Sequence, residues 1–107
     1  MVIISFNNKE LRDNCASLSR AEAAFGSIVG PDIITALSDA EACGSVQELL
    51  DLYDHAATTK ADIVNVALGL GFNMSLVAVG AGRTTNPDKG CDWRAVRRLK
   101  VMEITKC

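Results

Sequence analysis

The sequence lacks the features that mark membrane and exported proteins. None of its apolar runs approaches the roughly 20 residues that a membrane span requires. Residues 1–6 carry no basic region before their short apolar run, and they are too few for a signal peptide. We therefore expect a cytoplasmic protein that makes no contact with a membrane.

The sequence also lacks the ligand pattern of a zinc protein. Its cysteines are Cys15, Cys43, Cys91 and Cys107, which form no C-x-x-C pair, and His55 is the single histidine. A structural zinc site needs about four ligands at close spacing, so we expect no metal and no other cofactor. Cys15 and Cys43 fall among apolar positions and are predicted to be buried thiols, because disulfides are rare in the cytosol.

Net positive charge is absent, although the charges are unevenly distributed along the chain. The 11 basic and 13 acidic side chains give a formal net charge of −2, so there is no overall attraction to nucleic acid. The segment from residue 83 onward is nevertheless basic, whereas residues 32–54 are acidic. Local cationic surface can bind phosphates in such a protein. The same side chains also suit an ordinary solvated surface, so both interpretations stay open.

The last third of the chain predicts an antiparallel sheet. Residues 62–68 are rich in β-branched side chains, and residues 72–79 alternate apolar with polar ones. The glycines of residues 69–71 supply the positive φ of a tight hairpin between these two runs. Basic and apolar residues interleave in residues 97–104, which predicts a third strand with one wet face.

The first half predicts one strand and three helices. Residues 2–6 form a short apolar strand that joins the sheet at its edge. Asn7 or Asn8 then caps a helix, and the capping-box pattern of Ser19 and Glu22 indicates a restart or a kink within it. A second helix begins at Pro31 and ends at Gly44, and a short helix follows it.

The order of these elements indicates an α+β fold. It is β-α-α-β-β-β apart from the short helix, with a small antiparallel sheet packed on two N-terminal helices. Residues 54–61 are interpreted as a polar connection into the hairpin. The length of 107 residues suits a single domain, 1–107, and a hydrophobic content of 49% is enough for a core.

Three stretches resemble the RelE/HigB-type toxins of type II toxin–antitoxin systems, in the plasmid maintenance killer subgroup. Residues 4–12, Ile-Ser-Phe-Asn-Asn-Lys-Glu-Leu-Arg, resemble the first strand of the family running into a helix. Residues 36–49 resemble its second helix and the turn after it. Residues 92–104 resemble the D-W-x-x-V-x-x-I-x-I-x-E-I end of the killer subgroup, and this match is the most specific. The order and length agree over nearly the whole chain.

The resemblance implies a concave basic face that enters the ribosomal A site and cleaves messenger RNA without a metal. In such a site a base or a positioned cation helps the 2′-hydroxyl attack the adjacent phosphate, and an acid protonates the leaving 5′-oxygen. Arginines stabilise the charge of the transition state. The resemblance also implies a cognate antitoxin of helix-turn-helix type, and a toxin–antitoxin heterotetramer on operator DNA.

Cationic side chains around the predicted sheet are the candidates for these roles. The candidate catalytic residues are His55, Lys60, Arg83, Arg98 and Lys100. The candidate RNA-binding residues are Arg94, Arg97 and Lys106. Alternation places Arg98 and Lys100 on one face of the last strand, with Arg97 and Leu99 on the other. Each of these residues also suits a solvated loop or strand face.

Two departures from the family pattern open an alternative. Asn73 stands where many members carry an arginine, and residues 104–107 stand where the subgroup commonly ends in Gly-Asp-Tyr-His. Two catalytic contributions of the family are therefore missing. The alternative is a non-catalytic or weakened member that acts by binding, either as a DNA gyrase poison like the related ParE proteins or as an antitoxin-bound autorepressor. An unrelated small α+β interaction module is a third reading.

Overall fold

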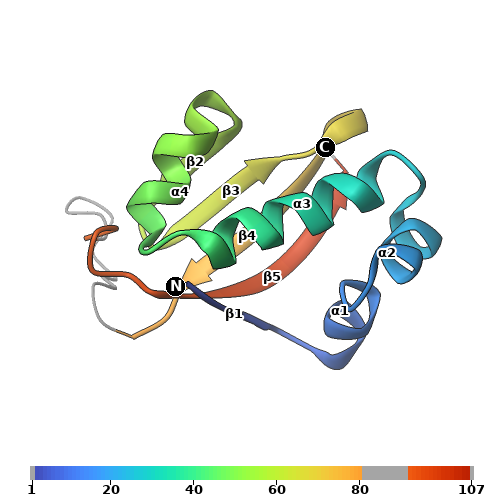
Figure 1. The fold of residues 1–107 in the computed structure, drawn as a ribbon, viewed down its shortest axis with the longest axis horizontal. Helices are drawn as coiled ribbons and strands as arrows, with labels where there is room; N and C mark the ends of the chain where they lie inside the picture. Colours follow the sequence, from blue (N-terminus) through green and yellow to red (C-terminus); the bar gives the residue numbers. More distant parts are fainter. Residues whose placement is uncertain (1, 81–91, 107) are drawn as a thin grey trace.

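The computed structural model describes residues 2–80 and 92–106, and its elements confirm the α+β class (Figure 1). The helices are α1 Lys9–Asn14, α2 Leu18–Phe25, α3 Val29–Ala42 and α4 Val46–Tyr53, with 3₁₀ turns η1 Asp54–Ala56 and η2 Gly69–Gly71. The strands are β1 Ile3–Phe6, β2 Ala57–Lys60, β3 Ile63–Ala67, β4 Phe72–Ala78 and β5 Arg98–Lys106. None of the helices described is both long and apolar enough to cross a membrane.

The strands form one mixed sheet in the order β1-β5-β4-β3-β2. The four strands from β2 to β5 pair with antiparallel neighbours, and β1 lies at the edge, as predicted, but runs parallel to β5. The sheet therefore differs from the wholly antiparallel one expected. A parallel pair needs a long crossover connection, and here the helical layer and the hairpins separate the two strands along the chain.

Strand β2 is an element that the sequence does not predict. Residues 54–61 were expected to be a polar connection, but they contain η1 and a strand that pairs with β3. Only Ala57 of this strand is buried, and the other three residues are polar and exposed. Without a second apolar residue there is no alternation to reveal the strand.

The predicted hairpin is confirmed, with β3 and β4 joined through η2. Gly71 adopts a φ of 77°, as expected of a glycine in a tight turn, and Leu70 also lies in the left-handed region with a φ of 58°. The carboxylate of Asp32 accepts a hydrogen bond from the Gly69 amide at 2.8 Å. The first turn of α3 is thereby tied to the tip of the hairpin.

Helix boundaries differ from the prediction in two places. Asn8 caps α1 by accepting from the Leu11 amide at 2.9 Å, and Ser17 caps a separate helix, α2. Helix α3 begins at Val29, two residues before Pro31. A proline is tolerated there because the amides of the first turn have no partner within the helix.

The core lies between the helices and one face of the sheet. Helix α3 runs along this face, across β4 and β5 in Figure 1. The sheet contributes fully buried side chains such as Leu76 and Leu99, and the helices contribute Ile33 and Leu49. Cys15 and Cys43 are buried and free, as predicted, and burial raises the pKa of both thiols.

Candidate nucleic-acid interface

The face of the sheet opposite the core is not covered by any helix that the structure describes. Side chains alternate along each strand, so the pairing register sets which residues share this open face. One row of the register crosses all five strands and carries a lysine at or next to each edge strand of the sheet. We call it the lysine row: Lys60 of β2, Ile63 of β3, Val77 of β4, Lys100 of β5 and Ser5 of β1.

A second row beside it is polar. Thr58, Asn65, Ser75 and Glu103 follow one another across β2, β3, β4 and β5, and we call them the polar row. The Ser75 hydroxyl donates to Asn65 Oδ1 at 2.8 Å, and Asn73 Nδ2 donates to the same oxygen at 3.1 Å. These bonds fix the orientation of the Asn65 amide. Its Nδ2 has no hydrogen-bond partner among residues 2–80 and 92–106.

The two rows surround a hollow of about 490 Å³. Its apolar wall consists of Ile63, Val77 and Met102, while Lys60 and Glu103 carry opposite charges at its border. A second hollow, of about 650 Å³, shares Val77 and Met102 and is lined by Lys100. Both volumes fall in the range of ligand-binding clefts, about 300–1,000 Å³.

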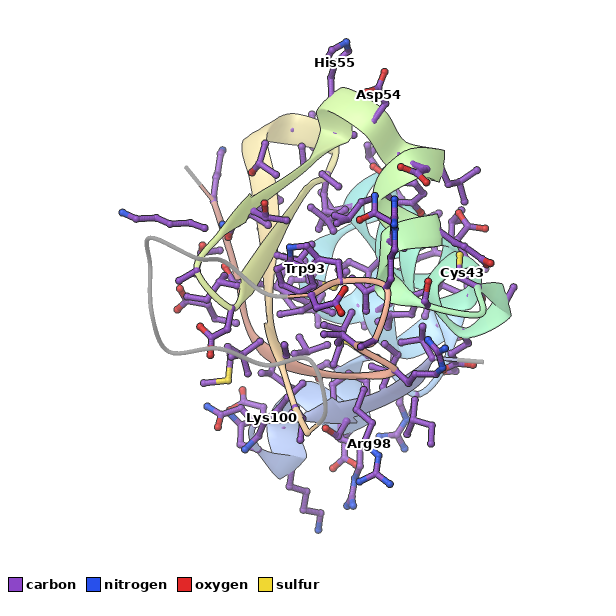
Figure 2. The ribbon with its side chains drawn as sticks, turned by 90° about the vertical axis from the view of Figure 1, so that its left-hand side faces the viewer. Cys43, Asp54, His55, Trp93, Arg98 and Lys100 are labelled. Carbon is purple, nitrogen blue, oxygen red and sulfur yellow. The ribbon has the colours of Figure 1, made fainter. Side chains whose placement is uncertain are left out.

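The register places Arg98 and Lys100 as the alternation predicts. Lys100 pairs with Val77 and Arg98 lies opposite Ile3, so both belong to the open face. Leu99, between them, is fully buried on the core side. Figure 2 shows Arg98 and Lys100 at the same end of the molecule. Their guanidinium and ammonium groups can therefore contact one extended anionic ligand together with Lys60.

His55 does not lie with these cations. It lies in η1, and its side chain is 99% exposed, with Nε2 3.5 Å from Asp54 Oδ2. Figure 2 shows it at the end of the molecule opposite Arg98 and Lys100. The whole of β2 separates His55 from the end of the open face that Lys60 occupies.

The other candidates are spread beyond the open face. Arg97 precedes β5, and its Nη1 donates to the Arg94 carbonyl oxygen at 2.9 Å. Lys106 lies at the far end of β5, in register with Phe72, whose ring packs against the core. Arg83 lies outside the described residues. Of the candidates within residues 2–80 and 92–106, Lys60, Arg98 and Lys100 are the ones that share the open face.

Asn65 and Glu103 are site residues that the sequence reasoning missed. Asn65 is a polar residue in the middle of an otherwise apolar strand, between the buried Val64 and Val66. A polar residue that alternates with apolar ones in a strand predicts a side chain on the solvent-facing side of the sheet. Glu103 gave no such signal, because its facing depends on an irregularity in β5 that simple alternation does not include.

The fold and this face define a small α+β protein with an open, lysine-bearing sheet. Comparison of the chain with protein-family models, with curated proteins and with solved structures finds no match. In residues 2–80 and 92–106, no three His, Cys, Asp or Glu side chains group so that they could hold a metal ion.

Proposed function

We propose that this chain is a cytoplasmic toxin of a type II toxin–antitoxin pair, of the RelE/HigB kind, that cleaves messenger RNA on the ribosome. The observation that carries the proposal is the open sheet face, where Lys60 and Lys100 line two hollows that share Val77 and Met102. Arg98 extends the cationic side chains along β5. Such a surface suits a phosphodiester chain even though the protein as a whole is acidic.

These cations match the steps of metal-free RNA cleavage. The planar fork of an arginine holds a phosphate through two donors, so Arg98 fits the role of fixing the scissile phosphate. Positive charge beside that phosphate stabilises the transition state as the 2′-hydroxyl attacks. The 2′-hydroxyl proton passes to water as its oxygen bonds to phosphorus, and an ammonium group on Lys60 or Lys100 gives a proton to the 5′-oxygen as its bond to phosphorus breaks.

The proposal includes a cognate antitoxin of helix-turn-helix type that neutralises the toxin by protein contact. A heterotetramer of the two proteins on operator DNA belongs to the same proposal. The support for both partners is the resemblance of residues 4–12, 36–49 and 92–104 to the killer subgroup.

A second candidate function, binding without cleavage, is favoured by two positions. His55 lies at the far end of the molecule from Arg98 and Lys100, away from a phosphate held by them. Asn73, at the family's arginine position, donates to Asn65 and Ser75. A toxin of this kind would inhibit growth by occupying its target, which is RNA on the ribosome or DNA gyrase.

The test is controlled induction of the protein in bacteria, with growth measurement and mapping of RNA 5′ ends. We expect growth arrest with new 5′ ends at a fixed codon position, relieved by the antitoxin. Growth arrest without new ends would support binding without cleavage, and a DNA damage response would then identify gyrase as the target.

The double variant Arg98→Ala/Lys100→Ala connects this phenotype to the open face. We expect it to remain folded and to inhibit growth less, because both side chains lie outside the core. The matched control is Lys9→Ala/Arg20→Ala, which removes the same charge from exposed positions in α1 and α2. Unchanged toxicity of the folded Arg98/Lys100 variant would remove these residues from the site.

A further inference from the structure

The hollow beside Lys60 contains a carboxylate that phosphate binding does not require. Glu103 is exposed on β5 and lines the hollow together with Lys60. A negative charge here repels the phosphates that the lysines would attract. A carboxylate on a nucleic-acid-binding surface is instead suited to accept hydrogen bonds from the N–H groups of a base edge.

The polar row places a hydrogen-bond donor across from this carboxylate. Asn65, Ser75 and Glu103 are consecutive in the register, so Asn65 and Glu103 lie two strand spacings apart, about 10 Å between Cα atoms. Ser75 between them is short and leaves room for a planar group. The oxygen of Asn65 is already engaged, so the amide presents its Nδ2 donor to a ligand.

The lysine row supplies an apolar surface and two phosphate contacts beside these polar groups. Val77 and Met102 are half-buried and line both hollows, so the flat face of a base can pack against them. Lys60 and Lys100 are three strand spacings apart, about 14 Å between Cα atoms. That separation suits phosphates on either side of a bound nucleotide.

We propose that the hollow binds a guanine base of single-stranded RNA. Glu103 accepts hydrogen bonds from the guanine N1–H and 2-amino groups, and Asn65 Nδ2 donates to O6. Among the four bases, guanine alone presents two adjacent donors next to an acceptor on its Watson–Crick edge, the edge that proteins read in unpaired RNA. The inference rests on the proposed function, in that it requires the open face to bind RNA.

The test is fluorescence anisotropy of the full chain with three short RNA oligomers. One oligomer is all uridine, the second has a central guanosine, and the third has inosine there, which lacks the 2-amino group. We expect the guanosine oligomer to bind about tenfold more tightly than the all-uridine one, as a bidentate base contact does, with inosine between them.

A charge-neutral variant assigns this preference to the carboxylate. We expect Glu103→Gln to lose the preference for guanosine without weakening the all-uridine complex, because the repulsion of phosphate falls with the charge. Glu41→Gln in α3 is the matched control, since it removes one exposed carboxylate from the helical layer. Thermal unfolding of both variants establishes that they are folded.

The outcomes separate the base site from RNA binding itself. Equal affinity of the wild-type protein for all three oligomers, or a preference that survives in Glu103→Gln, would overturn the guanine site and leave RNA binding intact. Failure of every oligomer to bind would overturn the proposed function, and the guanine site with it.

Discussion

Removal of the two lysines of the lysine row gives the sharpest physical test of the open face. The variant Lys60→Gln/Lys100→Gln shortens each side chain by one atom and removes its charge. Both residues lie on the uncovered face, and Lys100 lines the second hollow together with Val77 and Met102. Glutamine retains half of the methylene groups of lysine, and both positions lie outside the core, so we expect the fold to be unchanged.

The size of the effect follows from counterion release. For single-stranded RNA each phosphate contact contributes about −0.7 to the slope of log affinity against log salt. Loss of two contacts therefore reduces the slope by about 1.4, so a tenfold rise in salt weakens the wild-type complex about 25-fold more than the variant. Anisotropy titrations of one RNA oligomer at several salt concentrations measure both slopes.

A matched pair of cations outside the face controls for net charge. Lys9→Gln/Arg20→Gln removes two positive charges from exposed positions in α1 and α2. We expect its salt slope to equal that of the wild type. Equal slopes for the lysine-row variant and the wild type would refute the assignment of Lys60 and Lys100 to phosphate contacts.

Three further predictions test the packing, the pH dependence and the role of His55. A Cβ added at Gly30 would lie 2.7 Å from the Glu22 backbone nitrogen, so Gly30→Ala should lower the free energy of unfolding by about 1–3 kcal/mol in urea titrations; no loss would contradict this packing. Burial, and then the hydrogen bond to Asp39, raise the pKa of Tyr53 above its usual 10.0. The folded state holds this proton more tightly than the unfolded state, so the free energy of unfolding should fall as pH rises above 10.0. The fall should be less steep in Tyr53→Phe. Parallel curves of unfolding free energy against pH for the two proteins would contradict this role of Tyr53. His55→Ala should leave RNA affinity in the anisotropy assay unchanged, and a large loss would return His55 to the site.

Local patterns predicted the elements whose signals lie within a few residues. Alternation in β4 and the glycines of η2 define the hairpin, and both signals depend only on near neighbours. The capping asparagine of α1 is equally local. Alternation also placed Arg98 and Lys100 on one face, because period two holds along the first part of β5.

Features that depend on distant pairing could not be predicted in this way. The direction of β1 relative to β5 is set by the path of the chain through the helices, and nothing in either strand encodes it. Likewise, residues 57–60 form a strand because they pair with β3, and their own sequence carries no strand pattern. Proximity in sequence is no guide to position here either, since β2 extends over about 10 Å from Ala57 to Lys60 and His55 lies in η1 before it.

The facing of Glu103 depends on a bulge in β5. Leu76 pairs with Val101 and Ser75 pairs with Glu103, so Met102 is an extra residue opposite this step. Strict alternation from Val101 would turn Glu103 toward the core, and an unpaired buried carboxylate is strongly unfavourable. The bulge instead lets Ile104 pack against the core and leaves Glu103 at the hollow. Bulges commonly redirect a side chain near functional sites. One inserted residue thereby keeps the core apolar and sets a hydrogen-bond acceptor beside the lysine row.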